Sequence, residues 1–300
     1  MERDSLRYKI RRKIQAFAGN IAPHELLCSI YSRIVIKKRV NIRQPKTFNE
    51  KIQWCKLYFY PKNPLIVQCT DKYTARDYVS GKGLSNILVP LLGAWENSSE
   101  IVWSSLPDHF VLKCSHGCAY NILCTDKCHF DHRAASKQLD QWLKEDFGAF
   151  NLELHYSQIK KPMIICEPFL GECITDYKFF CFNGHPECLY VSTDLIHDRK
   201  AKIGFFHLDG KKMPMKRDDY EDIDRIELPE FYSEMRATAQ LLCQDFPFVR
   251  VDFFVTANRY YFSELTFTPG AGMMPFNPDV YDEKWGEMLH LEREMELYGK

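Results

Sequence analysis

The sequence predicts an α+β protein whose strands pair mainly as antiparallel hairpins. Two apolar runs, 177–182 and 187–191, flank Asn183-Gly184, the dipeptide most typical of a two-residue hairpin turn. Two more, 248–255 and 260–265, enclose a short polar turn. Elsewhere apolar residues recur at helical spacing, which adds helices to these strand pairs.

Length and composition indicate an ordinary soluble protein. The chain has 300 residues, of which 45% are apolar and 27% charged, enough for one bilobal domain or two small ones. The sequence contains neither an apolar run of membrane-spanning length nor the apolar segment of a secretory signal. Its twelve cysteines are therefore expected to be reduced thiols, and the expected location is cytoplasmic.

The N-terminal region is expected to be helical and basic. Residues 1–40 show helical spacing, with Ile10, Ile14 and Phe17 among the apolar positions, and a second helical stretch covers 26–35. Residues 1–50 hold twelve Lys or Arg and four Asp or Glu, a net charge of +8, so the neutral chain carries −8 elsewhere. This charge fits contact with an anionic membrane surface or polymer, and equally a solvated helix face.

The elements of the middle of the chain follow from local signals. Thr47 with Glu50 forms a capping-box pattern at a helix start. Helices are then expected over 70–79 and around 139–147 and 230–245, and the polar stretch 209–228 is expected to be a mobile loop. The remaining strand predictions are 87–92, 110–114, 121–124 and 163–170.

The last hairpin carries charged side chains on one face. Arg250 and Asp252 are two residues apart on one strand, so they point to the same side, as do Glu264 and Thr266 on the partner strand. Two carboxylates on one side suit Mg²⁺ that also binds substrate phosphates, and an arginine suits the charge that develops during phosphoryl transfer. An exposed sheet face with an ordinary salt bridge is the competing interpretation.

Other candidate residues lie upstream. Lys113 ends a strand before the small-residue loop 115–120, an arrangement that can hold nucleotide phosphates but is also compatible with a plain hairpin. Glu167 stands where an apolar strand meets a turn, either at the mouth of a ligand cleft or in solvent. Asp176 and Lys178 share one face of the following strand.

A cysteine- and histidine-rich stretch offers a competing zinc site. Its members fall within sixteen residues: Cys114, His116, Cys118, Cys124, Cys128 and His129. Their spacing differs from the usual pair of cysteines two residues apart, and two of the thiols lie in predicted strands. Buried structural thiols are therefore the preferred interpretation.

Taken in order, these segments resemble the ATP-grasp superfamily, and more closely its TupA-like branch, named for teichuronopeptide biosynthesis. The matching strings span about residues 45–290: PKTFNEKIQW, TDKYTARDYV, VPLLGAW, HFVLKCSHGCAYNILC, CEPFL, DYKFFCFNG, FPFVRVDFF and YYFSELTFTPGAG. The resemblance implies a bilobal fold of two antiparallel-sheet lobes with helices, holding the nucleotide between them. It implies a helical N-terminal region 1–70, an N-lobe 71–165 and a C-lobe 166–300.

The resemblance also implies roles for the matching residues. Arg250 and Lys113 would be catalytic, the first at the acyl-transfer centre, and Asp252, Glu264 and Thr266 would hold Mg²⁺. Those implied to bind ATP are Lys72, Lys113, Ser115, His116, Gly117, Asn121, Glu167, Phe169, Leu170, Asp176 and Lys178. Within this set, 115–121 matches the phosphate-covering loop, and 167–170 the hinge that pairs with adenine.

Two departures from the family pattern bear on function. Many ATP-grasp ligases have Asn where Thr266 stands, and a hydroxyl is a weaker metal ligand. A basic helical region replaces the usual preceding Rossmann-like domain, so the resemblance does not carry over the binding of the acceptor.

The implied activity is ATP- and Mg²⁺-dependent ligation of a carboxylate to an amine through an acyl phosphate. The expected substrates are an amino acid and a uronic-acid glycan or lipid-linked glycan acceptor. The basic N-terminus is expected to allow peripheral contact with the inner face of the membrane, and no nucleic acid is expected as a partner. A sugar kinase on the same fold and a non-catalytic polysaccharide-binding module are the alternatives.

Overall fold

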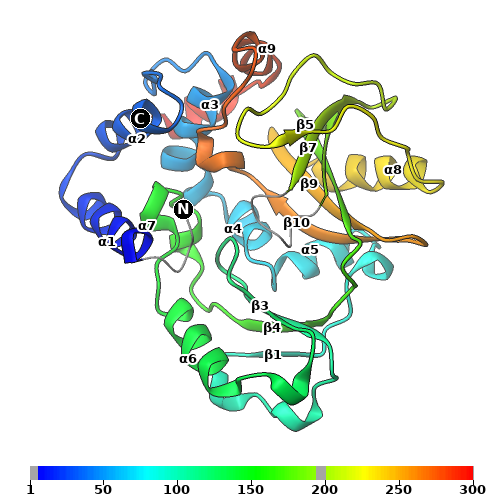
Figure 1. The fold of residues 1–300 in the computed structure, drawn as a ribbon. Helices are drawn as coiled ribbons and strands as arrows, with labels where there is room; N and C mark the ends of the chain where they lie inside the picture. The colour runs from blue at the N-terminus through cyan, green and yellow to red at the C-terminus, as the bar shows by residue number, and fades with distance from the viewer. Residues whose placement is uncertain (1–5, 194–200, 300) are drawn as a thin grey trace. The chain divides into compact units, whose positions relative to one another are not determined.

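The computed structural model describes residues 6–193 and 201–299 (Figure 1). Its contacts divide the chain into two compact units. The first, here the helical unit, comprises Met1–Val67, Asp146–Gln158 and Phe267–Lys300. The second, the sheet unit, comprises Gln68–Glu145 and Ile159–Thr266. The boundaries predicted at 70/71 and 165/166 stay a prediction.

The helical unit is built from short helices, several of them a single turn. They are α1 (Leu6–Ile21), α2 (His24–Val35), α3 (Phe48–Trp54), the π-helix η1 (Cys55–Phe59), η2 (Tyr60–Lys62), α7 (Gly148–Asn151), η7 (Tyr156–Gln158), η9 (Pro269–Gly272), α9 (Val280–Met288) and α10 (Glu292–Tyr298). Helix α4 (Pro64–Thr70) continues from this unit into the sheet unit. The predicted N-terminal helix is confirmed from Leu6 onward, and residues 1–5 lie outside the described part.

Helix α3 begins as its sequence predicts. The Thr47 side chain accepts a hydrogen bond from the backbone N–H of Glu50. The Glu50 carboxylate in turn accepts one from the Thr47 N–H at 3.1 Å, which completes the capping box. Phe48 then packs edge-on against Phe276 and Trp285, with ring centres 6.0 and 5.5 Å away. Within the helical unit, α3 is thus packed against a segment that lies more than two hundred residues later in the sequence.

The sheet unit holds two sheets and the helices that cover them. Its strands are β1 (Gly93–Trp95), β2 (Phe110–Cys114), β3 (Asn121–Cys124), β4 (Ile164–Pro168), β5 (Thr175–Phe182), β6 (His185–Thr193), β7 (Lys202–His207), β8 (Glu221–Asp222), β9 (Phe248–Val255) and β10 (Tyr260–Thr266). Its helices are α5 (Ala75–Gly81), η3 (Ser85–Ile87), η4 (Ser98–Glu100), η5 (Trp103–Ser105), η6 (Lys127–His129), α6 (His132–Leu143) and α8 (Tyr232–Cys243).

The smaller sheet has the order β1-β4-β2-β3, and all its pairs are antiparallel. The predicted β2–β3 hairpin is confirmed, with Lys113 opposite Asn121. Helix α6 packs against β2. Lys113 therefore lies on a central strand, where the backbone holds it from both sides.

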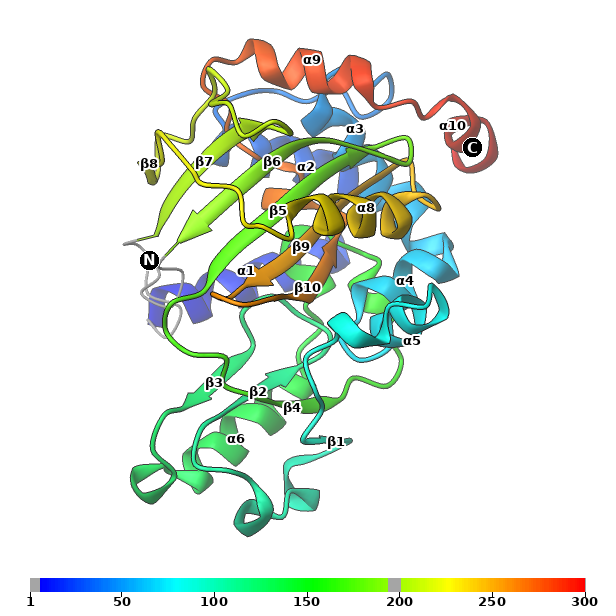
Figure 2. The same cartoon turned by 90° about the vertical axis from the view of Figure 1, so that its right-hand side faces the viewer.

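The larger sheet has the order β10-β9-β5-β6-β7-β8 and is antiparallel except for the parallel pair β7–β8. The β5–β6 turn uses Asn183 and Gly184 at φ of 50° and 81°, the left-handed pair that a tight hairpin requires. Figure 2 shows α8 lying across this sheet, where it contacts β5, β6 and β9. Phe179 and Phe253 point to that side, so alternation sends their neighbours Lys178 and Asp252 to the opposite face.

Three local predictions need correction. The apolar run 87–92 is not a strand: Ile87 ends the turn η3 and Leu88 makes only an isolated parallel bridge with Phe262, because Pro90 has no N–H for a ladder. The helix predicted from residue 70 begins at Ala75, because the Asp71 carboxylate accepts from the N–H groups of Tyr73 and Thr74 and holds a turn. The polar stretch 209–228 includes β8 and the buried Met213 and Met215, so it is packed.

No helix among the described residues is both long and apolar enough to cross a bilayer.

Candidate active site

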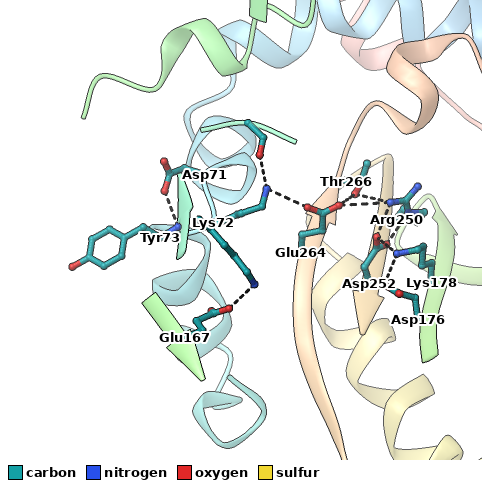
Figure 3. Close-up of polar contacts among 12 residues, drawn as sticks. Asp71, Lys72, Tyr73, Glu167, Asp176, Lys178, Arg250, Asp252, Glu264 and Thr266 are labelled. Atoms are coloured by element: carbon teal, nitrogen blue, oxygen red, sulfur yellow. Dashed lines mark hydrogen bonds and ion pairs between the residues drawn. The ribbon is translucent and has the colours of Figure 1, made fainter. Parts of the chain in front are cut away.

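Three neighbouring strands of the larger sheet present a row of charges on one face. Register places Lys178 of β5 opposite Asp252 of β9, and Asp252 opposite Glu264 of β10. Two residues before Asp252 on β9, Arg250 lies opposite Thr266 of β10. Two residues before Lys178 on β5, Asp176 lies opposite Phe254 of β9, at the other end of the row. Figure 3 shows these side chains gathered on one side of the strands. The convergence predicted for the last hairpin is confirmed and extends to β5.

Arg250 and Asp252 form the centre of this row. The guanidinium donates twice to the carboxylate, from Nε to Oδ1 at 2.7 Å and from Nη2 to Oδ2 at 2.6 Å. The Asp252 side chain is completely buried. Because a planar guanidinium matches a carboxylate in two parallel hydrogen bonds, this pair has a fixed geometry.

Lys178 and Asp176 extend the row along β5. The Lys178 ammonium donates to Asp176 Oδ1 at 2.8 Å and to Asp252 Oδ2 at 3.2 Å. Both side chains of the β5 pair are buried. Lys178 therefore bridges two carboxylates whose negative charges would otherwise repel each other.

Thr266 links the cation and the outer carboxylate. Its hydroxyl accepts from Arg250 Nη2 at 3.0 Å and donates to Glu264 Oε1 at 3.1 Å. The hydroxyl thus orients Glu264 directly. Its role as a third metal ligand stays a prediction.

Lys72 reaches the row from the turn that follows α4. Its ammonium lies 3.3 Å from Glu264 Oε2 and donates to the Gly117 carbonyl at 2.9 Å. Figure 3 shows this lysine extended toward Glu264. Lys72 therefore connects the charged row with the loop that the sequence assigned to the phosphates.

Lys113 and Glu167 form a second ion pair, on the smaller sheet. Lys113 Nζ lies 2.5 Å from Glu167 Oε2, and Arg76 Nη1 lies 3.4 Å from Oε1. The Lys113 ammonium also lies 5.5 Å from the ring centre of Phe254 on β9. Lys113 is thus close to the face that carries the charged row. Phe169 and Leu170 follow β4 and are half-buried.

The loop between β2 and β3 is held by its own side chains. Ser115 Oγ donates to Asp71 and accepts from the Met163 N–H at 3.0 Å. His116 Nε2 lies 3.1 Å from the Trp142 carbonyl and 3.2 Å from that of Glu145. These two side chains fix the loop from within, so any contact with phosphate would come from its backbone. Asn121, at the start of β3, is exposed.

The pKa values of the charged side chains reflect both their burial and these contacts. Burial alone raises the pKa of Glu264, but Lys72, Arg250 and Lys178 outweigh it and lower the pKa to about 2. Burial lowers the pKa of Lys178 and of Arg250, yet their neighbouring carboxylates raise both above the ordinary values. Burial raises the pKa of Asp176 more than Lys178 lowers it.

Asp252 and Glu264 fit Mg²⁺, which prefers carboxylate oxygens and completes its shell with water and phosphate. They face each other on adjacent strands, as a shared ion requires. Asp252 Oδ2 accepts from two donors, whereas Oδ1 accepts from Arg250 alone and keeps one lone pair. Glu264 is the more accessible of the two, with 30% of its side chain exposed.

The cysteine-rich stretch combines buried and exposed thiols. Cys114 and Cys124 are buried in strands, while Cys118 and Cys128 are exposed. His129 Nδ1 pairs with Asp126 at 2.6 Å. Among the described residues, no group of three or more His, Cys, Asp or Glu side chains is arranged to hold a metal by itself.

A sequence model of the TupA-like ATP-grasp family matches residues 50–290, and the chain belongs to this family. The α+β fold with helices and two mostly antiparallel sheets is the ATP-grasp fold. No curated protein matches the chain.

Several solved structures are similar to it. D-alanine–D-alanine ligase from Bacillus anthracis, complexed with ATP, is 13% identical with a TM-score of 0.47, over 75% of this chain and 66% of that one. L-amino acid ligase from Bacillus licheniformis is 13% identical with a TM-score of 0.42, over 69% of this chain and 44% of that one. The chain thus spans less than two thirds of the length of these proteins.

The sequence predictions did not include Arg76, whose guanidinium lies 3.4 Å from Glu167 in the structure. Arg76 stands four residues after Lys72, one turn along the helical stretch predicted there, and this spacing was the available signal. Its partner Glu167 is far away in sequence, so the pair could not be inferred from local pattern.

Proposed function

We propose that this protein is an ATP-dependent carboxylate–amine ligase. The observation that carries the proposal is the row of three cations and three carboxylates formed by Lys72, Arg250, Lys178, Asp176, Asp252 and Glu264. Such a row provides both oxygen ligands for Mg²⁺ and positive charge for phosphate oxygens. Membership of the ATP-grasp family supports the same reading.

The proposed reaction has two steps. A carboxylate oxygen of the substrate attacks the γ-phosphorus of ATP, the bond to the bridging oxygen breaks, and ADP leaves. The amine nitrogen of the second substrate then attacks the acyl carbon of the resulting acyl phosphate. Phosphate leaves with the former carboxylate oxygen, and the amine gives up a proton. Binding both substrates at one site removes most of the entropic cost of their encounter.

Each residue of the row has a proposed task. Lys72 and Lys113 would bind phosphate oxygens, and Asp252 with Glu264 would hold Mg²⁺, which would supply positive charge to offset that of the phosphates. Arg250 stabilises the oxyanion formed when the amine attacks. Lys178 holds Asp176 and Asp252 in place through its two hydrogen bonds.

Nucleotide binding requires an exchange of partners. Lys72 pairs with Glu264 and Lys113 with Glu167 in this structure, so both lysines would have to leave these carboxylates to bind phosphate, and Glu264 would then be free to hold Mg²⁺. The charges of the row balance without ligand. Mg²⁺ held by Asp252 and Glu264 would replace part of the positive charge that Glu264 loses when Lys72 turns to the phosphates.

The proposed substrates are an amino acid and a uronic acid of a cell-surface polysaccharide precursor. This rests on the TupA-like branch of the family. The proposed location is the cytoplasm, where ATP is available.

The test is a screen for phosphate release from ATP and Mg²⁺ in the presence of amino acids and uronic-acid glycans, with the product identified by mass spectrometry. We expect phosphate release with amide formation, reduced at least about a hundredfold in Asp252→Asn. The exposed Glu296→Gln is the matched control and should retain full activity. ADP with a phosphorylated sugar would identify a kinase, and full activity of Asp252→Asn would contradict any catalytic role for the row.

A further inference from the structure

Helix α1 exposes its apolar residues and turns polar ones inward. Ile14, Phe17 and Ile21 have 61%, 66% and 69% of their surface exposed, whereas Gln15 has 9%. With Ile10, these residues recur at intervals of four, three and four, so they form one stripe along the helix. A helix that faces water normally shows the opposite pattern, so this stripe calls for an apolar partner.

Polar contacts fix this orientation. Gln15 Nε2 donates to Asn151 Oδ1 at 3.3 Å, and the Arg12 guanidinium lies 3.7 Å from the ring centre of Phe150. Both partners belong to α7, which packs against α1 in the helical unit. The cation–π contact thus holds the half-buried Arg12 against α7, so Arg12 is not one of the exposed basic residues of α1.

Helix α2 repeats the arrangement. Leu26, Ile30 and Ile34 are exposed at intervals of four, while Leu27 and Cys28 of the same helix are buried. Figure 1 shows α1 and α2 as the first two helices of the chain. Two consecutive helices therefore each bury one face and leave an apolar stripe exposed.

The surroundings of both stripes are basic. Arg11 and Lys13 are exposed on α1, and Arg33, Lys37 and Arg39 are exposed on and just after α2. Between residues 5 and 49 the only acidic residue is Glu25, which pairs with Arg43 at 3.2 Å. The two helices themselves therefore contribute net positive charge, and just after α2 Lys38 pairs with Asp279 at 3.0 Å.

We propose that the exposed faces of α1 and α2 dock onto an anionic lipid bilayer, with both helices lying in the interface. A bilayer surface offers an apolar layer beneath negative headgroups, which matches a stripe of Ile, Leu and Phe flanked by Lys and Arg. A second copy of this face would bring like charges together, and a nucleic acid would leave the apolar stripe in water. The residues of this surface belong to the helical unit, whereas those of the charged row belong to the sheet unit.

The test is flotation of the full-length protein with phosphatidylcholine vesicles that either contain or lack phosphatidylglycerol. The protein should float with the anionic vesicles and be released by salt. Ile14→Gln with Phe17→Gln should weaken binding at least about tenfold. Arg11→Gln with Lys13→Gln should weaken it by roughly fivefold per charge. Val102→Gln with Leu297→Gln, which removes two equally exposed apolar residues elsewhere, should have no effect.

A second readout does not depend on weakened variants. Phe17→Trp should show tryptophan emission shifted to shorter wavelength when anionic vesicles are added, because the ring leaves water. Wild-type protein that stays unbound to anionic vesicles, or binding equal in all variants, would overturn the proposal. So would a dimer in sedimentation velocity that Ile14→Gln with Phe17→Gln converts to a monomer, since the stripe would then be covered by a second copy.

Discussion

Asp252 and Glu264 are paired carboxylates with different surroundings. Asp252 is fully buried and accepts three hydrogen bonds from Arg250 and Lys178. Glu264 is partly exposed, and its cationic partners Lys72 and Arg250 come from opposite sides. Removal of either charge leaves buried cations without compensation, which typically costs about 3–5 kcal/mol for a fully buried pair. Because Glu264 is partly exposed, exchanging its cationic partners requires less free energy than exchanging those of the buried Asp252.

The pKa of Glu264 predicts a pH-dependent contribution to stability. Its pKa falls from an ordinary 4.5 to about 2 in the folded protein. A carboxyl with a lowered folded pKa stabilises the fold above its unfolded pKa and loses that contribution as pH falls toward the folded value. Glu264→Gln should therefore lower the free energy of unfolding at neutral pH by on the order of 1–3 kcal/mol.

Urea unfolding at a series of pH values measures this difference. The gap between wild type and Glu264→Gln should narrow below about pH 4.5 and close toward pH 2. Glu296→Gln, an exposed carboxylate, should match the wild type throughout. A gap that stays constant with pH would contradict the assigned ion pairs.

Strand alternation was enough to predict which charged residues share a face. Arg250, Asp252 and Glu264 lie together because side chains two apart on a strand point the same way. Lys72 and Glu264 are almost two hundred residues apart, and local pattern carries no information about such a pair. The buried hydrogen bonds of Ser115 and His116 were missed for the same reason.

At the scale of elements, the β5–β6 hairpin depends on its turn. Gly184 has φ of +81°, and an added Cβ would lie 3.4 Å from backbone atoms of Gln244. Gly184→Ala should therefore destabilise the protein by about 1–2 kcal/mol, because a side chain disfavours this backbone region. Gly81→Ala is the matched control, since its Cβ would meet nothing within 4 Å and its φ is not positive. Thermal unfolding of the two variants measures this difference in stability. Equal Tm values would contradict the requirement for glycine at the positive φ of position 184.

Lys56 joins two segments of the helical unit. It is completely buried and donates to the carbonyls of Asn151 at 2.8 Å and Ala271 at 2.9 Å. Lys56→Met keeps the aliphatic stem but leaves both carbonyls unpaired, so unfolding free energy should fall by about 2–4 kcal/mol. Lys137→Met, at an exposed position, should change it by less than about 0.5 kcal/mol. Urea unfolding that gives equal values for both variants would rule out this role.

Elements with local signals were predicted well, and elements set by distant contacts were not. The capping box at Thr47 and the turn at Asn183-Gly184 lie within a few residues of the elements they define. The run 87–92 was wrongly predicted as a strand, because its apolar composition was given more weight than the missing N–H of Pro90. The polar stretch 209–228 was predicted as a loop throughout, because the sequence alone did not reveal the pairing of β8 with β7, and its mobility stays a prediction.

For the whole molecule, the ends of the chain fold together. Phe267–Lys300 belongs to the same compact unit as Met1–Val67, with Asn49 donating to the Met274 carbonyl at 2.9 Å and accepting from the Met274 N–H at 2.8 Å. No periodicity in the sequence predicts such a pairing of termini. The family resemblance, in contrast, predicted the two sheets correctly, because it rests on the order of many segments.

Nucleotide binding should stabilise the whole protein. A ligand that binds only the folded state at a hundredfold excess over its Kd adds about 2.7 kcal/mol. Mg²⁺ with ATP should therefore raise the Tm by several degrees, and chelation of Mg²⁺ should remove most of the shift. Asp252→Asn should show little shift, whereas Glu296→Gln should respond like the wild type. An equal shift without Mg²⁺ would contradict the assignment of Asp252 and Glu264 to the metal.

The central claim, that the charged row activates a carboxylate with ATP, is tested most directly by following the carboxylate oxygens. A uronic-acid substrate labelled with ¹⁸O in its carboxylate is incubated with the amino acid, ATP and Mg²⁺, and the released phosphate is analysed by mass spectrometry. We expect one ¹⁸O atom in phosphate for each amide bond formed, because the carboxylate oxygen leaves with phosphate. Unlabelled phosphate, or phosphate retained on a sugar hydroxyl, would contradict it.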